Sequence, residues 1–157
     1  MNTIRRAKPS DVDGILKLLV QVNMVHHNGR PDLFKGPTTK YSGEELLKII
    51  ADETTPVFVS VDERNRILGH AFCVVKETRG DRLLMDIKTL YIDDICVEAE
   101  ARGQGVGAAL YHSVLDYARA IECYNVTLNV WTCNPGAIAF YEKLGLKAQK
   151  IGMEVIL

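Results

Sequence analysis

The chain has 157 residues, of which 47% are hydrophobic, so it can bury most of its apolar surface around one core. Its 19 basic and 20 acidic side chains give a net charge of -1, which excludes the electrostatic footprint of a protein that binds nucleic acid or an anionic membrane. No apolar run approaches the roughly eighteen residues that span a bilayer, and the first residues show no signal-peptide pattern. We therefore expect one cytoplasmic domain over residues 1–157.

The first third of the chain predicts a short strand and two helices. Residues 3–7 form the strand, and residues 10–13 are a capping-box variant that begins a helix. A second capping box, Ser42 to Glu45, begins a shorter helix that ends before Pro56. The polar, proline-broken segment 26–37 between them is long for a connection, and such loops are often functional. The apolar face of the first helix is Ile15, Leu18, Leu19, Val22 and Val25.

The middle of the chain predicts strands joined by turns. Residues 57–61 and 67–75 form a hairpin around the polar turn 62–66, and a further turn at residues 79–81 leads to a strand ending at Val97. With later strands at residues 126–131 and 153–156, the element order is β-α-α-β-β-β-α-β-α-β. This order indicates an α/β fold with a layered sheet.

A glycine-rich turn follows the strand that ends at Val97. Gly103, Gly105 and Gly107 let the backbone approach an anion closely, and a helix starting near Val106 adds the positive end of its dipole. The spacing G-x-G-x-G does not fit the dinucleotide fingerprint, and Ala108 stands where a nucleotide-triphosphate loop needs lysine. The turn therefore predicts a phosphate cradle of another kind, with a ligand-free connection as the alternative.

A short helix is predicted after the apolar run 126–131. Asn134 fits a helix N-cap, Pro135 the first helical position, and Gly145 the left-handed residue that ends a helix. Tyr141 on this helix would, taken alone, be a half-buried packing residue.

The two motifs together resemble the GCN5-related N-acetyltransferase (GNAT) family over about residues 85 to 150. The sequence R-x-x-G-x-G at Arg102, Gly105 and Gly107 is similar to the acetyl-coenzyme A pyrophosphate loop of that family. The family pattern N-x-x-A-x-x-F-Y-x-x-x-G-F is matched at Asn134, Ala137, Phe140, Tyr141 and Gly145, with Leu146 replacing the last phenylalanine. The resemblance implies a single-domain α/β fold, with a mixed, mostly antiparallel sheet flanked by helices, and a homodimer.

The resemblance also implies roles for individual residues. Tyr141 is expected to donate a proton to the sulfur of coenzyme A, and backbone N–H groups near Ile95 to Val97 to hold the pantetheine arm and the acetyl oxygen. The residues implied in binding acetyl-coenzyme A are Ile95, Cys96, Val97, Arg102, Gly103, Gln104, Gly105, Val106, Gly107, Ala108, Asn134, Ala137, Phe140 and Tyr141.

The catalytic base is sought in the acidic pair Asp93 and Asp94, which precedes the glycine-rich turn. Asp93 matches the acidic residue that the family uses as a base, and both carboxylates suit a cationic substrate. Because side chains alternate along a strand, only one of the two can face the substrate unless a bulge intervenes. A purely binding role for either aspartate, and deprotonation through water, are the alternatives.

No metal is expected. His26, where the long loop begins, is a further candidate for the substrate site; the alternative is a surface histidine favoured by the helix dipole. Neighbouring helical residues point about 100° apart, so His26 and His27 cannot chelate one ion together. No C-x-x-C motif, disulfide framework or nucleophile signature involves the four cysteines, which are Cys73, Cys96, Cys123 and Cys133.

We therefore expect an N-acetyltransferase that moves an acetyl group from acetyl-coenzyme A directly to a primary amine, without metal, nucleic acid or membrane. A small amine, a diamine or an amino acid is the expected acceptor, because two adjacent carboxylates suit a cation. The alternatives are a non-catalytic acyl-coenzyme A sensor or regulatory protein on the same fold, and an acetyltransferase of protein N-termini or lysines.

Overall fold

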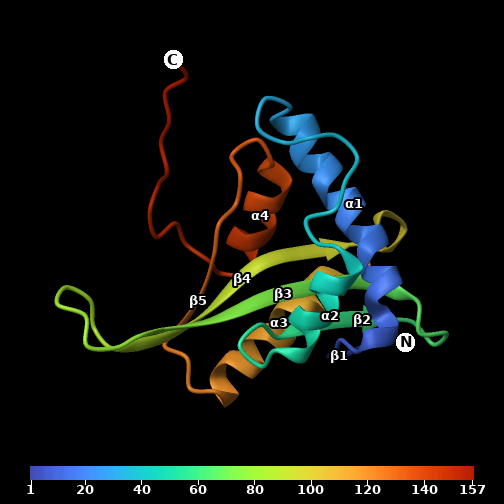
Figure 1. The fold of residues 1–157 in the computed structure, drawn as a ribbon, viewed down its shortest axis with the longest axis horizontal. Coiled ribbons are helices and arrows are strands. Elements are labelled where there is room, and N and C mark those ends of the chain that lie inside the picture. The colour runs from blue at the N-terminus through green and yellow to red at the C-terminus, as the bar shows by residue number, and fades with distance from the viewer.

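The computed structural model describes residues 1–157 and contains one five-stranded sheet in the order β1-β2-β3-β4-β5 (Figure 1). Strands β1 to β4 pair antiparallel, and β5 pairs parallel to β4. The sheet is thus mixed and mostly antiparallel, which confirms the predicted fold class. The strands are β1 (Thr3–Arg6), β2 (Val57–Val61), β3 (Ile67–Thr78), β4 (Ile87–Val97) and β5 (Asn125–Leu128).

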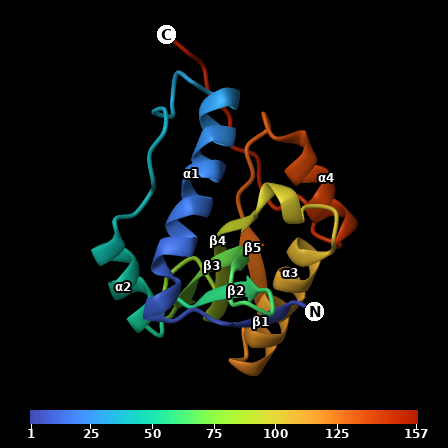
Figure 2. The same cartoon turned by 90° about the vertical axis from the view of Figure 1, so that its right-hand side faces the viewer.

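Helices cover both faces of this sheet (Figure 2). Helices α1 (Val12–Gly29) and α2 (Gly43–Ala51) lie on one face, and α3 (Val106–Ala120) lies on the other. Helix α4 (Pro135–Lys143) follows β5 and has no fully buried residue. The two 3₁₀ turns are Pro9–Asp11 and Ala99–Ala101.

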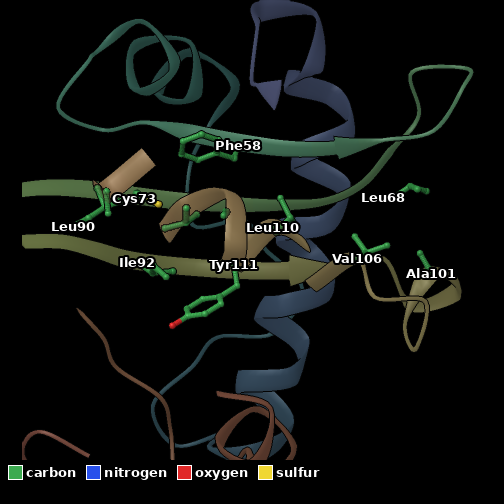
Figure 3. Packing of buried hydrophobic residues seen from close by; sticks show 12 residues of the cluster. Phe58, Leu68, Cys73, Leu90, Ile92, Ala101, Val106, Leu110 and Tyr111 are labelled. Atoms are coloured by element: carbon green, nitrogen blue, oxygen red, sulfur yellow. The ribbon is translucent and has the colours of Figure 1, made fainter. Parts of the chain in front are cut away.

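Two apolar clusters fill the space between the layers. The cluster under α1 and α2 includes Ile15, Leu19 and Leu46, which pack on Val59 and Phe72 of the sheet. The cluster under α3, shown in Figure 3, joins that helix to the opposite face of β2, β3 and β4. Its labelled members are Phe58, Leu68, Cys73, Leu90, Ile92, Ala101, Val106, Leu110 and Tyr111.

The predicted helix starts are confirmed with one correction. Ser42 is the N-cap of α2: its hydroxyl accepts from the Glu45 N–H at 3.2 Å, and the Glu45 carboxylate accepts from the Ser42 N–H at 3.3 Å. Ser10, in contrast, does not cap α1. The Asp11 carboxylate turns back to accept from the Arg5 guanidinium at 2.7 Å and the Lys8 N–H at 2.8 Å, so an ion pair closes this end.

Strand β4 runs further than the strand beside it. Its residues Thr89 to Ile92 pair with β5, whereas residues 93–97 pair only with β3 on the other side. The second edge of β4 is therefore free of a strand from Asp93 to Val97. This free edge leads directly to the glycine-rich turn.

The predicted strand at residues 153–156 is wrong. Residues 147–157 form no strand and make no backbone hydrogen bond within the chain, because no strand edge lies beside them (Figure 1). The alternating apolar side chains that suggested a strand are exposed: Ile151 by 82%, Met153 by 93% and Val155 by 80%. An ion pair between Arg30 and Glu154 ties this C-terminal tail to the end of α1.

No helix of the protein is both long enough and apolar enough to cross a membrane.

Candidate active site

The glycine-rich turn between β4 and α3 presents free backbone donors. Gly103 and Gly105 have φ angles of 75° and 80°, the left-handed region that favours glycine. The N–H groups of residues 103–108 donate no hydrogen bond within the chain, and those of residues 106–108 open helix α3. A concave run of unpaired N–H groups at a helix N-terminus fits a phosphate group.

Gly107 serves a different purpose from the other two glycines. A Cβ atom at Gly107 would lie 3.1 Å from Cζ of Phe140 and 3.4 Å from Cγ2 of Val97. Its lack of a side chain therefore lets the Phe140 ring of α4 approach the first turn of α3. The glycine-rich turn thus fixes the place of α4 as well as presenting backbone donors.

Two side chains of the turn donate hydrogen bonds to backbone carbonyls. Arg102 is exposed, and its Nε donates to the Val97 carbonyl at 3.2 Å, across the end of β4. Gln104 donates to the Glu100 carbonyl at 3.1 Å. Arg102 thus brings a positive charge to the residue that immediately precedes the free N–H groups.

Helix α4 carries the predicted acid. Asn134 caps the helix by accepting from the Ala137 N–H at 3.2 Å, Pro135 is its first residue, and Gly145 follows it with a φ of 96°. All three predicted helix signals are confirmed. Because the Asn134 oxygen serves the cap, its side-chain N–H₂ is the group left to bind a ligand.

Tyr141 is held in its protonated form. Its pKa is raised above the ordinary value of 10.0, first by burial and then by the negative charge of Asp94. A neutral phenol at physiological pH can donate a proton, which is the property required of an acid in acyl transfer.

A β-bulge places both aspartates on one face of the sheet. The register of β3 against β4 pairs Phe72 with Asp94 and Cys73 with Ile92, and Asp93 is left without a partner. The extra residue interrupts the alternation of side chains. Both carboxylates reach groups around the Phe72 ring, which lies on the α1 and α2 face.

The two aspartates have different partners. Asp93 Oδ2 accepts from the Lys40 ammonium at 2.5 Å and from the Tyr41 hydroxyl at 3.2 Å. Asp94 Oδ2 is bonded to Nε2 of His70 at 2.8 Å. Asp93 therefore faces the loop that leads into α2, and Asp94 faces the buried His70 of β3.

Sequence reasoning did not single out His70, Lys40 or Tyr41. His70 interrupts the apolar run of β3 and is fully buried, with 0% of its surface exposed. A histidine inside an otherwise apolar strand was the available signal for it. No pattern in the sequence pointed to Lys40 or Tyr41, since their contacts with Asp93 join positions more than fifty residues apart.

His26 lies in a separate aromatic group. Its ring packs 5.0 Å from the Phe34 ring, which in turn meets the Trp131 ring at 5.3 Å, and His27 Nδ1 lies 2.7 Å from the Phe34 carbonyl oxygen. These contacts hold the long loop against α1 and the segment before α4. A substrate role for His26 stays a prediction.

The cysteine near the site is unsuited to act as a nucleophile. Cys96 is buried, its sulfur lies 3.7 Å from the Leu18 carbonyl oxygen, and burial raises the pKa of its thiol to about 12. Only the thiolate is nucleophilic, so Cys96 is inert at neutral pH. No group of three or more His, Cys, Asp or Glu side chains is arranged to hold a metal ion.

The end of β4 thus gathers the groups predicted from two separate motifs. A cradle of free N–H groups, a free strand edge, two carboxylates and a neutral tyrosine lie on β4, the turn after it and α4. This set of groups suits acyl transfer from an anionic carrier.

Comparison with known proteins supports the resemblance to the GNAT family. The model of the acetyltransferase (GNAT) family matches residues 25–146, and the chain belongs to this family. Relatives of the chain are named N-acetyltransferases, and the chain spans 62% of the length of the first of them.

Two relatives show how far the similarity extends. The chain is 31% identical to glucosamine 6-phosphate N-acetyltransferase 1 of Oryza sativa over 110 residues, covering 70% of this chain and 62% of that protein. It is 33% identical over 121 residues to glucosamine 6-phosphate N-acetyltransferase of Trypanosoma brucei, covering 73% of this chain and 76% of the relative.

Solved structures agree on the fold. A mutant protein from Bacillus halodurans superposes with a TM-score of 0.94 at 30% identity, covering 99% of both chains. Glucosamine-6-phosphate N-acetyltransferase of Arabidopsis thaliana superposes with a TM-score of 0.73 at 22% identity, covering 99% of this chain and 98% of that one. The second likeness concerns the fold alone.

Proposed function

We propose that the protein transfers an acetyl group from acetyl-coenzyme A directly to a primary amine. The observation that carries this proposal is the meeting of an anion cradle, an acidic pair and a protonated tyrosine at one end of β4. Members of this family use acetyl-coenzyme A as donor. The donor supplies the acetyl thioester whose carbonyl carbon the amine attacks.

The residues of the cradle fit the anionic part of this donor. The free N–H groups of residues 103–108, with the dipole of α3 and Arg102, would hold the pyrophosphate. The free edge of β4 at Ile95 to Val97 and the Asn134 amide would bond the pantetheine arm.

Two proton transfers remain for side chains. Tyr141 gives its hydroxyl proton to the departing sulfur, a role that its raised pKa supports. The sequence assigns the base to Asp93, and the bulge brings Asp94 to the same face.

The acceptor carries an ammonium group that pairs with the acidic pair. A small amine, a diamine or an amino acid meets this requirement. An amino sugar phosphate is a second candidate, because the named relatives act on glucosamine 6-phosphate and because Lys40 beside Asp93 offers a cation for an anionic substituent.

Two other activities compete with this proposal. A non-catalytic acyl-coenzyme A sensor needs the cradle but not a protonated Tyr141 beside two carboxylates. An acetyltransferase of protein N-termini or lysines would need a surface for a peptide chain, whereas Lys40 and Tyr41 stand over Asp93.

We further propose a homodimer. The exposed apolar side chains of the C-terminal tail support it, because a strand-like segment of this composition is stabilised by pairing with another strand. A second copy of the chain offers such a partner.

The test is a screen for release of free coenzyme A from acetyl-coenzyme A across acceptor classes. The panel contains diamines, amino acids, glucosamine 6-phosphate and a lysine peptide, and the matched control enzyme is Tyr141→Phe. Release that depends on one of the small amines supports the proposal. Tight donor binding without release in any class favours the sensor, and release with the peptide alone favours a protein acetyltransferase.

A further inference from the structure

We propose that His70 is a positioning residue that orients Asp94 as the proton acceptor for the acceptor amine, while Asp93 binds the charge of that amine. The inference deepens the proposed function and rests on it. It assigns the base to the second aspartate of the pair, and it gives a role to a buried histidine of β3.

The surroundings of His70 favour a role beyond packing. The side chain is fully buried, and Nδ1 has no hydrogen-bond partner. A buried polar atom without a partner costs about 1 to 3 kcal/mol, so an apolar side chain would serve the fold better. The one polar contact of the ring is Nε2 to Asp94 Oδ2, at 2.8 Å.

This contact fixes both the tautomer and the carboxylate. A carboxylate only accepts, so Nε2 carries the proton and donates to Asp94. Nδ1 has no partner within the chain, so this single bond is what orients the ring towards Asp94. The Phe72 ring, 4.9 Å away and nearly perpendicular, holds the imidazole in this plane.

The two aspartates differ in the partners that hold them. Asp93 Oδ2 accepts from the Lys40 ammonium and the Tyr41 hydroxyl, and its Oδ1 is left to accept from the ammonium group of the substrate. Asp94 has only His70 as a partner on Oδ2, and its Oδ1, like that of Asp93, accepts no hydrogen bond within the chain. Taking up a proton would break the ion pair between Asp93 and Lys40, whereas Asp94 has no lysine or arginine partner to lose.

Asp94 is also the aspartate whose charge affects the pKa of Tyr141, the proposed acid. The negative charge of Asp94 contributes to the raised pKa of Tyr141, and Asp93 does not. The base must reach the amine and the acid must reach the sulfur across one thioester group. The effect of Asp94 on the pKa of Tyr141 is in keeping with a pairing of this base with this acid, and the contact with His70 remains the observation that selects Asp94.

The charged and titratable groups around Asp94 come from four elements. Cys96 lies on the same strand, His70 bonds to Asp94 from β3, and Tyr141 of α4 is the group whose pKa the charge of Asp94 raises. Asp93, with Lys40 and Tyr41, lies on the side of the loop before α2.

The acetyl-transfer step moves two protons from the nitrogen of the acceptor. The acceptor ammonium gives one proton to Asp94 Oδ1, and its nitrogen forms the C–N bond as the C–S bond of the thioester breaks. The sulfur takes the hydroxyl proton of Tyr141. The second proton leaving the nitrogen restores Tyr141, and Asp94 returns its proton to solvent, so one proton is released for each acetyl group moved.

The experiment compares Asp94→Asn with Asp93→Asn, using the acceptor that the wild type turns over best. Asp94→Asn should lower kcat by about 10² to 10⁴, as expected for loss of a general base. Asp93→Asn should leave kcat near wild type and raise the KM for the amine roughly tenfold, because one charged contact is lost.

His70 is tested with two variants of different chemistry. His70→Leu removes the donor, so it should lower kcat by as much as about 10²-fold and move the acidic limb of the rate profile to higher pH. His70→Gln keeps an N–H donor and should return the limb towards the wild-type position. The double variant His70→Leu with Asp94→Asn should be no slower than Asp94→Asn alone, since His70 acts through Asp94.

Other outcomes overturn the inference. If His70→Leu slows turnover to the same extent with and without Asp94, or leaves the acidic limb in place, His70 is structural. If Asp93→Asn alone abolishes turnover, Asp93 is the base. A wild-type enzyme that acetylates no amine contradicts the proposed function instead, so the two failures are distinguishable; circular dichroism shows that each variant is folded.

Discussion

Tyr141 is the residue on which the proposed chemistry depends most. Replacing it with phenylalanine removes only the hydroxyl, so kcat should fall by about 10² to 10⁴ while the affinity for acetyl-coenzyme A stays near wild type. Steady-state rates and calorimetry measure the two effects. A variant that keeps more than about half of the turnover, with chemistry rate-limiting, would make Tyr141 a packing residue.

The raised pKa of Tyr141 gives a prediction for the alkaline side of the rate profile. The acid must be protonated, and its pKa lies above 10.0, so activity is lost only as the pH rises through a higher value. At saturating amine, kcat should therefore stay level up to pH 10. An alkaline limb well below pH 10 that disappears in Tyr141→Phe would contradict this assignment.

For single residues, the sequence predicts which side chains form the candidate site better than it predicts the contacts among them. Asp93, Asp94 and Tyr141 follow from motifs, because spacing along the chain fixes their place on a strand and a helix. The bulge that turns both aspartates to one face depends on the register against β3, which periodicity does not determine. The contacts of His70 and Lys40 are long-range, so no local pattern contains them.

Among the elements, the turn between β4 and α3 is the most constrained. Gly105 has a φ of 80°, so a side chain there strains the backbone and projects beside the free N–H groups. Gly105→Asp should abolish binding of acetyl-coenzyme A in calorimetry, because it also adds a negative charge. Gly36→Asp, in an open position without a left-handed backbone, is the matched control and should bind normally. Unchanged affinity in folded Gly105→Asp would refute the cradle.

The elements themselves were largely predictable. The capping box at Ser42, the cap at Asn134 and the turn glycine at position 145 are local signals, and each is confirmed. The first helix begins differently because the Asp11 carboxylate accepts from the guanidinium of Arg5 in β1. The strand predicted at residues 153–156 fails for a related reason: local alternation indicates a strand, but only a partner strand stabilises one.

For the whole molecule, the C-terminal tail gives the test of assembly. Ending the chain after Ala148 removes the exposed apolar side chains of the tail, which are Ile151, Met153, Val155, Ile156 and Leu157. Light scattering should show a dimer for the full chain and a monomer for the shortened one. Met153→Lys with Val155→Lys, which keeps the length but adds charge, should also weaken the dimer. A full chain that is monomeric, or equal masses for all three proteins, would contradict the proposed homodimer.

Direct transfer of an acetyl group from acetyl-coenzyme A to a primary amine is the activity that we propose for this protein. The most direct test uses acetyl-coenzyme A with an isotopic label in the acetyl group and follows the label by mass spectrometry. Direct transfer should place the label on the nitrogen of the amine, in an amount equal to the free coenzyme A released, and none on the protein. Label retained on a cysteine, or donor that is bound but never consumed with any amine, would contradict it.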